Sequence, residues 1–214
     1  MTTFEELACA RRSIRKYAPD PVRPEDLAAL LRAAQAAPSA CGAQNWLFVV
    51  LQGRKDIEGL ARAVEAGVRR AHREFLPEAE ESYVEGRVRH STFFRSAPLV
   101  LAVYMRPVAY ADARLEAAMR GAGLSYEAEM ERLARPDILG LGAAIENLLL
   151  CAQDLGYGGC WIGSNGNATA ERVGKVLRLP AGWKIYALFS VGVPAEEAHR
   201  DKKRLEEVVS YNGF

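Results

Sequence analysis

Residues 138–155 of the chain read ILGLGAAIENLLLCAQDL, a run that is apolar nearly all the way around a helical wheel. This pattern predicts a central helix that is buried on most sides. Gly140 and Gly142 each cost about 1 kcal/mol of helix propensity relative to Ala. We therefore expect close packing against another backbone there, with a second subunit as the natural candidate. Glu146 and Asn147 lie inside the run and need polar partners. They could pair across a dimer interface or reach a cofactor pocket, and we favour a structural role for both.

Three further runs are continuously apolar rather than alternating, which is typical of strands buried on both faces. They cover residues 46–51, 99–105 and 185–193. Residues 57–95 are rich in Arg, Glu and Ala, and they predict helix with an exposed charged face that is interrupted at Pro77. The pattern as a whole predicts a sheet covered by helices, in one domain that spans residues 1–214.

Helix signals flank this central part of the chain. Thr3 and Glu6 fit a capping box at the start of a helix, and Pro24 opens a second helix. After residue 155 we expect a turn, a short strand and a polar loop, followed by a helix over about residues 169–177. Residues 110–135 are charged and poor in strand signals, so we expect helix and loop that cover another part of the protein.

Composition and charge exclude several classes of protein. The 28 basic and 27 acidic residues leave a net charge of +1, so no global field draws the chain to nucleic acid or to anionic lipid. Polar residues within the longest apolar run disfavour a membrane span. The four cysteines and three histidines lack the spacing of a metal site, and the N-terminus lacks the layout of a signal peptide. We therefore expect a soluble, reduced, cytoplasmic protein.

Two short basic clusters stand at opposite ends of this nearly neutral chain. The first contains Arg11, Arg12, Arg15 and Lys16, and the second contains Arg200, Lys202, Lys203 and Arg204. Arg meets a phosphate group with a planar fork and Lys adds a point charge, so both clusters have the chemistry of a phosphate site. The alternative for either cluster alone is a solvated charged turn.

The loop over residues 38–46 is rich in small residues, which would let a flat ring approach the backbone closely. Its backbone N–H and C=O groups could then bind the edge of a heterocycle, with Gln44 and Trp46 fixing the loop. The alternative is an ordinary connection from helix to strand. Cys41, in this loop, and Cys160 have no nearby histidine motif, so we expect both to be small packed residues.

Familiar catalytic motifs are absent from the sequence. The glycines at 156 and 158 lack the third glycine of a dinucleotide fingerprint and follow a predicted helix rather than a strand. The chain has no nucleophile elbow, no His-Glu-x-x-His and no phosphate-binding P-loop. No protein nucleophile, general acid or general base is therefore predicted, and no residue is assigned a catalytic role.

Taken in order, four pieces of the chain resemble the nitroreductase family of FMN enzymes. They are RRSIRKY at residues 11–17, APSACGAQNWLFVV at residues 37–50, AAIENLLL with LGYG and CWIG within residues 143–163, and SVGVP with LEEVV at residues 190–194 and 205–209. The resemblance implies an α+β sandwich in which a central, mostly antiparallel sheet is wrapped by helices. It also implies an interlocked homodimer that binds FMN at the subunit interface.

The resemblance also implies which residues bind the cofactor. On the flavin's phosphate, ribityl chain and pyrimidine edge it places Arg11, Arg12, Ser13 and Arg15, with Lys202 and Arg204 helping to hold the phosphate. From the partner subunit it brings Pro38, Ser39, Ala40 and Gly42, while Gly163 and Ser164 border the ring. The chain departs from the family pattern at Gly42, often Asn, and at Asn45, often Pro. A flavin hydrogen bond is therefore lost or moved to the backbone.

The activity that the resemblance implies is ping-pong hydride transfer. NADH or NADPH reduces the flavin at N5, and an electron-poor small molecule such as a nitroaromatic or a quinone is reduced next, with the chemistry carried by the cofactor. Relatives that dehalogenate their substrates or fragment flavin leave those reactions open as alternatives, as does a non-catalytic FMN-binding protein. Residues 110–135 would then be a lid over the flavin.

Overall fold

The computed structural model describes residues 3–108, 113–163, 167–199 and 201–213. Its centre is a four-stranded sheet in the order β1-β2-β4-β3, in which every neighbouring pair is antiparallel. The strands are β1 (Trp46–Leu51), β2 (Leu99–Met105), β3 (Gly158–Ile162) and β4 (Lys184–Gly192). The three long strands and the short strand after residue 155 are confirmed, and so is the mostly antiparallel sheet.

Burial differs between the strands. Every residue of β2 is buried, as expected for a central strand with both faces covered. β1 is an edge strand instead, and Leu47 and Val50 are more than one-third exposed. The prediction that β1 is buried on both faces is therefore wrong for a single chain, because strand order, and not local hydrophobicity, decides which strand lies at the edge.

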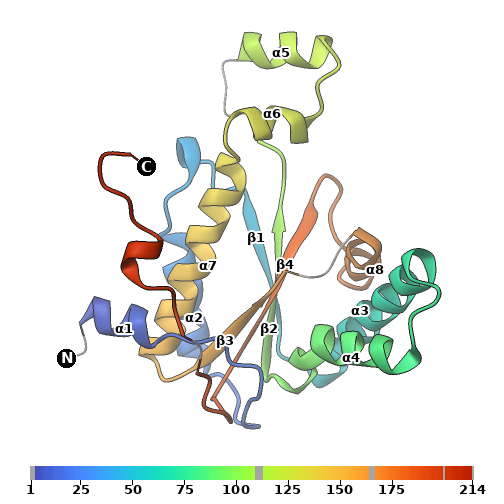
Figure 1. Cartoon of the computed structure of the whole chain (residues 1–214), viewed down its shortest axis with the longest axis vertical. Helices are drawn as coiled ribbons and strands as arrows, with labels where there is room; N and C mark the ends of the chain where they lie inside the picture. The colour runs from blue at the N-terminus through green and yellow to red at the C-terminus, as the bar shows by residue number, and fades with distance from the viewer. Residues whose placement is uncertain (1–2, 109–112, 164–166, 200, 214) are drawn as a thin grey trace.

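Two layers of helices cover the sheet (Figure 1). On one face, α2 (Pro24–Gln35) packs against α7 (Pro136–Asp154), with α1 (Phe4–Ala10) beside them. On the other face lie α3 (Arg54–Phe75), α4 (Glu81–Thr92) and α8 (Asn167–Val176). Alternate β2 residues point into the two layers, since Val100, Ala102 and Tyr104 belong to one apolar core and Leu101 and Val103 to the other. This sandwich confirms the expected α+β fold.

The remaining elements are short. They are the 3-10 turns η1 (Ala40–Gly42), η2 (Phe93–Ser96) and η3 (Leu205–Glu207), together with the helices α5 (Ala113–Gly121) and α6 (Tyr126–Arg132). The capping box at Thr3 and Glu6 is present, and α3 ends just before Pro77, as predicted. Within the described residues, no helix is long and apolar enough to cross a membrane.

Helix α7 carries the apolar run that dominates the sequence. A Cβ on Gly140 would lie 3.3 Å from the carbonyl oxygen of Pro38 and from Cα of Ser39, so close backbone packing is confirmed there, against the same chain. A Cβ on Gly142 would meet nothing within 4 Å. Leu139 is 67% exposed. The helix is therefore buried against α2 and the sheet but leaves an exposed stripe, so the prediction of burial on most sides holds only in part.

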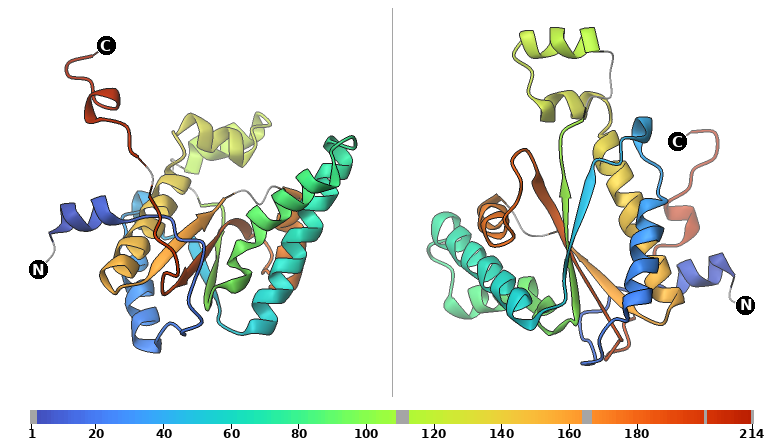
Figure 2. Two further views of the ribbon diagram at one scale, coloured as in Figure 1. Left: turned by 60° about the horizontal axis from the view of Figure 1, so that its bottom comes forward. Right: turned by 180° about the vertical axis from the view of Figure 1, so that it is seen from behind.

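Two parts of the chain stand away from the sandwich. Helices α5 and α6 project from one end of it (Figure 1). The described part of the C-terminal tail, residues 201–213, is exposed throughout, and Figure 2 shows it extending away from the body. Its large apolar residues Leu205, Val208 and Tyr211 are more than 60% exposed.

Candidate functional site

The Arg-rich segment at residues 11–17 is fixed to the outer edge of β3. Ile14 donates its backbone N–H to the carbonyl of Gly159 at 3.0 Å, and Ser13 pairs with Gly159 in a parallel bridge. The side chain of Ile14 is buried over Gly158. These contacts hold the backbone of an irregular segment along a regular strand, with Ile14 as its buried anchor.

Tyr17 anchors the other end of the same segment. Its hydroxyl lies 2.8 Å from Oγ of Ser190 on β4, and its backbone forms a bridge with Pro194. Burial raises the pKa of Tyr17, so the phenol stays neutral and acts as a structural hydrogen-bonding group. Nearby, the carboxylate of Glu196 accepts the backbone N–H groups of Arg15 at 2.6 Å and Lys16 at 3.1 Å. The turn is thus tied to the segment that follows β4.

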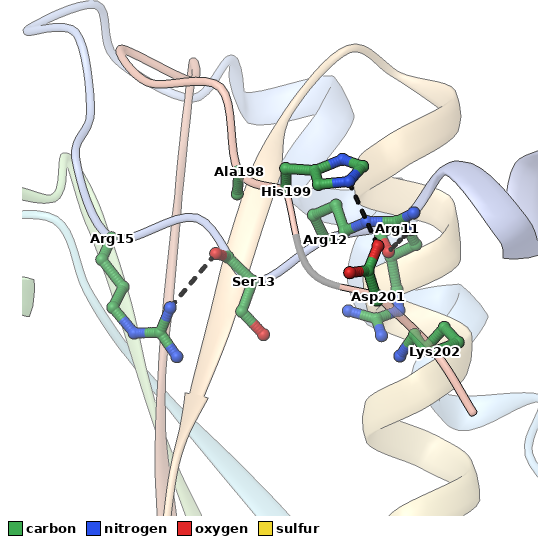
Figure 3. A pocket seen from close by; sticks show the side chains of 8 residues that line it. All are labelled: Arg11, Arg12, Ser13, Arg15, Ala198, His199, Asp201 and Lys202. Carbon is green, nitrogen blue, oxygen red and sulfur yellow. Dashed lines mark hydrogen bonds and ion pairs between the residues drawn. The ribbon is translucent and has the colours of Figure 1, made fainter.

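A cleft of about 290 Å³ opens beside this segment. It brings the basic residues near the N-terminus and part of the tail together, because the chain that leaves β4 passes alongside the segment bound to β3. Figure 3 shows Arg15 on the far side of Ser13 from the other charged groups. The lining residues are Arg11, Arg12, Ser13, Arg15, Ala198, His199, Asp201 and Lys202.

The charges in the cleft are not balanced. Arg11 forms an ion pair with Glu146 of α7 at 3.0 Å. Arg12 donates to the carbonyl of Arg11 at 2.8 Å, and the Arg15 guanidinium lies 5.8 Å from the ring centre of Phe93. Within residues that the structure describes, Arg12, Arg15 and Lys202 have no carboxylate partner.

The other charged pair in the cleft is His199 with Asp201, whose Nε2 and Oδ1 atoms lie 3.4 Å apart. Among the described residues that line the cleft, Asp201 is the one carboxylate, against the four cationic side chains of Arg11, Arg12, Arg15 and Lys202. The excess of positive charge suits a phosphate-sized anion. His199 and Asp201 were not among the predicted site residues, although they adjoin the basic tail cluster in the sequence.

Two other predicted cofactor residues lie outside the cleft. Arg204 is exposed, and its Nε lies 3.4 Å from Oε1 of Glu207. Gly163 directly follows β3, four residues beyond Gly159, or about 13 Å along an extended strand. Ser164 falls outside the described residues, as does Arg200 of the tail cluster. The cleft therefore lies near the start of β3, and Gly163 lies just beyond its end.

The loop before β1 lies elsewhere in the same chain. Pro38 and Ser39 contact α7 at Gly140, whereas Arg11 pairs with Glu146 six residues later, about 9 Å further along the helix and on a different face. None of the four predicted loop residues, Pro38, Ser39, Ala40 and Gly42, lines the cleft. One chain does not bring the two predicted halves of the site together.

Internal hydrogen bonds fix the shape of this loop. The side-chain amide of Gln44 donates to the carbonyl of Gln35 at 2.9 Å, and the backbone N–H of Gln44 donates to Oγ of Ser39 at 3.1 Å. This confirms that Gln44 fixes the loop. Cys41 is exposed, with a left-handed backbone at φ 53°, so the prediction of a packed side chain is wrong there. Cys160 is buried as predicted, and burial raises the pKa of its thiol.

Polar residues of the central helix find partners within the chain. Glu146 pairs with Arg11, and the amide of Asn147 donates to the carbonyl of Ala33 at 3.1 Å. The expected structural role is confirmed for Asn147. Glu146 also neutralises and orients Arg11, one of the arginines that line the cleft.

The sequence of the chain matches a known protein family. The model of the family described as "Nitroreductase family" matches residues 8–193. The chain is 32% identical over 192 residues to a 5,6-dimethylbenzimidazole synthase from Rhodospirillum rubrum, covering 87% of this chain and 80% of that protein. It is 31% identical over 208 residues to an NADH dehydrogenase from Thermus thermophilus, covering 94% and 92%.

A solved structure agrees with these sequence matches. The crystal structure of a BluB-like flavoprotein from Clostridium difficile 630 superposes with a TM-score of 0.83, with 27% sequence identity, and covers 100% of both chains. A second structure, the NADPH:FMN oxidoreductase from Vibrio harveyi, shares the fold with a TM-score of 0.69 and 21% identity, covering 99% of this chain and 77% of that one.

Proposed function

The chain belongs to the nitroreductase family and is an oxidoreductase, and on that premise we propose that it passes hydride from NADH or NADPH, through bound FMN, to an electron-poor small molecule. Nitroaromatics and quinones are the acceptors we propose. The observation that carries the proposal is the cleft beside β3, where Arg12, Arg15 and Lys202 have no carboxylate partner among the described residues. A local cluster of this kind in a chain of net charge +1 suits a phosphate group.

The residues present fit FMN in chemical type. The phosphate would bind in the cleft, on the side chains of Arg12, Ser13 and Lys202. Arg11 would contribute less charge, because Glu146 already pairs with it. Arg204 would join only if the tail changed its present contact with Glu207. The ring would lie toward the far end of β3, bordered by Gly163 and Ser164.

FMN would supply the hydride chemistry, and the protein would supply binding, orientation and electrostatics. The backbone of Arg15 is held by Glu196, and its guanidinium donates to the carbonyl of Ser13 at 3.4 Å and lies 5.8 Å from the ring centre of Phe93. That guanidinium would supply a positive charge to the pyrimidine edge of the ring, where negative charge accumulates on reduction. The absence of a side chain at Gly158 lets the Arg-rich segment lie close to β3, because a Cβ there would overlap the side chain of Ile14.

A homodimer would complete this site. Pro38, Ser39, Ala40 and Gly42 do not reach the cleft of their own chain, so they would approach the flavin of a second copy. The exposed stripe at Leu139, the β1 edge at Leu47 and the apolar tail residues are surfaces that such an interlocked dimer would bury. Helices α5 and α6, within the predicted lid at residues 110–135, would then cover a flavin at the interface.

We propose one domain over residues 1–214, working in the cytoplasm on small molecules, without a nucleic-acid or membrane partner. All four cysteines are free thiols, in agreement with a reducing compartment. The two apolar cores share the same central strand, β2, which supports a single folding unit.

A second candidate function is flavin fragmentation. It is favoured by the 32% identity to a 5,6-dimethylbenzimidazole synthase and by the full-length superposition on the BluB-like flavoprotein. In that case the cleft would hold FMN as a substrate and not as a resident cofactor. Chromatography of a reaction that contains reduced FMN and molecular oxygen as the oxidant distinguishes the two, since only oxidative fragmentation consumes flavin and releases 5,6-dimethylbenzimidazole.

The experiment starts with purified protein and added FMN. We expect saturable binding, bleaching of the flavin absorbance by NADH or NADPH without oxygen, and reoxidation by a nitroaromatic or a quinone. If the protein turns over only halogenated phenols, these compounds are its acceptors in place of the nitroaromatics and quinones that we propose. Bound FMN that neither nucleotide reduces would indicate a non-catalytic FMN-binding protein, and a protein that binds no FMN would overturn the proposal.

Two variants test the cleft directly. Arg12→Ala and Arg15→Ala should each weaken FMN binding by about 1.5–3 kcal/mol, or roughly 10- to 150-fold, because each removes a charged hydrogen bond. Arg62→Ala is the matched control, since Arg62 is exposed on α3 and pairs with Glu58. If both cleft variants bind FMN as well as the control does, the cluster is only a solvated turn.

A further inference from the structure

Arg11 links the cleft to helix α7, and we propose that Glu146 of α7 is the positioning residue that sets how firmly the cleft holds a phosphate. By pairing with Arg11, Glu146 withholds one positive charge from the cleft, so that FMN exchanges with solution instead of being retained. The inference rests on the proposed function, through the FMN site that both candidate functions share. It assigns a regulatory role to a carboxylate that does not itself line the cleft.

The backbone of Arg11 is fixed at the end of α1. Its N–H donates to the carbonyl of Leu7 at 3.1 Å, and its carbonyl accepts a hydrogen bond from the Arg12 guanidinium at 2.8 Å. From this point the side chain reaches α7, where Nε of Arg11 lies 3.0 Å from Oε1 of Glu146. The Arg11 side chain is 19% exposed and that of Glu146 is 48% exposed. The guanidinium therefore lines the cleft, while its partner carboxylate remains open to solvent.

Glu146 is held in this place by its own helix. The next residue, Asn147, donates its side-chain amide to the carbonyl of Ala33 in α2 at 3.1 Å, and Ile145 is buried in the core that α2, α7 and the sheet share. The helix therefore cannot turn to carry the carboxylate away from Arg11. An ion pair that is open to solvent adds little to the stability of a fold. The main effect of Glu146 is thus on the charge that Arg11 offers to a ligand.

A phosphate in the cleft competes with Glu146 for Arg11. One guanidinium has enough donors for two anions, but a carboxylate and a phosphate on the same guanidinium are close to each other and repel. Arg12 lies on the same side of Ser13 as Arg11 (Figure 3), and Lys202 also lines the cleft. Among the described residues neither Arg12 nor Lys202 has a carboxylate partner, so Arg11 is the cation of this group whose charge is already neutralised.

The strength of phosphate binding bears on the choice between the two candidate functions. Neutralising one arginine lowers the affinity for FMN without removing a hydrogen-bond donor from the cleft. FMN then exchanges with solution, which a protein that consumes FMN as a substrate requires and a protein that keeps FMN as a cofactor does not. Glu146 is therefore the residue near the cleft whose charge favours the second candidate function.

The test compares the full-length Glu146→Gln protein with wild type in FMN titrations monitored by flavin fluorescence. Glutamine keeps the size of the side chain and an acceptor for Arg11 but removes the negative charge. We expect the dissociation constant of FMN to fall about tenfold, which corresponds to one charged hydrogen bond gained. Glu74→Gln is the matched control, since Glu74 pairs with Arg70 at 3.9 Å on α3, in the other helical layer. Its affinity for FMN should equal that of wild type.

Two further measurements show whether the gain depends on Arg11 and on the phosphate. Arg11→Ala should weaken FMN binding by about threefold or less in the wild-type background, but by about tenfold in the Glu146→Gln background, because only there does Arg11 bind the phosphate fully. Riboflavin, which lacks the phosphate, should bind wild type and Glu146→Gln equally. The gain for FMN should also shrink as the salt concentration rises.

Three results would overturn the inference. An unchanged or weaker affinity for FMN in Glu146→Gln would show that the carboxylate only orients Arg11. An equal gain for riboflavin would show an effect on the ring and not on the phosphate. Additive effects of Glu146→Gln and Arg11→Ala would show that Glu146 does not act through Arg11.

Other outcomes separate this inference from the proposed function. If Glu146→Gln fails to fold, Glu146→Asp tests the same point, because its shorter side chain loosens the pair and should tighten FMN binding to a smaller extent. If wild-type protein binds no FMN, the proposed function is wrong. If Arg12→Ala weakens FMN binding but Glu146→Gln leaves it unchanged, only the role of Glu146 is wrong.

Discussion

Substituting Gly158 with alanine should detach the Arg-rich segment from β3. A Cβ at position 158 would lie 2.8 Å from Cβ of Ile14 and 3.1 Å from Cγ of Pro194, and closer still to Cγ1 of Ile14. Ordinary carbon contacts are about 3.5–4.0 Å, so Ile14 must move by roughly 0.7 Å or more. Because a Cβ atom is rigidly attached to its backbone, this movement strains the 3.0 Å hydrogen bond from Ile14 to Gly159.

The cost divides into two measurable parts. Overpacking of a buried site destabilises a protein by about 1–3 kcal/mol, and Ile14 is buried. Moving Ile14 also moves its neighbours Ser13 and Arg15 relative to the cleft. The loss of one charged hydrogen bond to the FMN phosphate adds about 1.5–3 kcal/mol to the free energy of binding, or roughly a 10- to 150-fold weaker complex.

The assay is thermal unfolding of the flavin-free protein, followed by an FMN titration monitored by flavin fluorescence. Gly59→Ala is the control, because a Cβ there meets nothing within 4 Å and alanine favours the helix by up to about 1 kcal/mol. A Gly158→Ala protein as stable as wild type, with FMN affinity within twofold of it, would refute the idea that close packing on Gly158 positions the arginines.

Three further predictions concern other parts of the molecule. Gly142→Ala should stabilise an isolated chain by up to about 1 kcal/mol through helix propensity. If this variant nevertheless forms a dimer that dissociates more readily in analytical ultracentrifugation, the exposed stripe of α7 lies at the interface; unchanged dissociation would argue against that placement. Tyr104→Phe should leave the unfolding free energy in urea unchanged or raise it by about 1 kcal/mol, since the Tyr104 hydroxyl is buried without a partner among the described residues; a clear loss of stability would reveal a hydrogen bond there. Hydrogen bonds from Arg23 and Tyr157 lower the pKa of Asp26, so its contribution to stability is present above the ordinary carboxyl pKa and is lost as the pH falls through the lowered value; acid unfolding curves of Asp26→Asn should therefore be flatter than those of wild type.

Local sequence was sufficient to predict those structural features that depend on one segment of the chain alone. The continuous run at β2 specified burial on both faces, and the capping box at Thr3 specified the start of α1. Pro77 marked the break between α3 and α4 because it cannot continue the hydrogen-bond pattern of a helix. These features depend on backbone chemistry or on one strand's own composition, so their outcome did not require knowledge of the fold.

Strand order and loop conformation were not available from local sequence. β1 is as apolar as β2, yet it is the edge strand, because a neighbour and not its own composition decides whether its outer side is covered. Cys41 is exposed in a loop with left-handed backbone at residues 41, 42 and 44, and this loop is held by hydrogen bonds from Gln44 to Gln35 and from Asn45 to the distant Arg106. Residue types alone favoured a packed cysteine there.

The candidate cleft could be predicted from the sequence only in part. The sequence marked both basic clusters as phosphate ligands in type, but a charged turn on the surface has the same composition. Their meeting depends on topology, since the first cluster is bound to β3 at Gly159 and the chain leaving β4 returns beside it at Ala198. His199 and Asp201 enter the cleft for the same reason, and nothing in their residue types distinguishes them from solvated tail residues.

Helix α7 connects the two halves of the proposed site. Its Gly140 supports the loop that would contact one flavin, and its Glu146 holds Arg11 beside the cleft for another, about 9 Å further along the same helix. A helix that is packed against α2 and the sheet is stiff over this length, so the two halves on one chain keep a fixed separation. A flavin bound across two chains must then fix the chains relative to each other. In the proposed dimer, cofactor binding and subunit association are therefore coupled through α7, and a ligand that binds only the assembled form stabilises it by mass action.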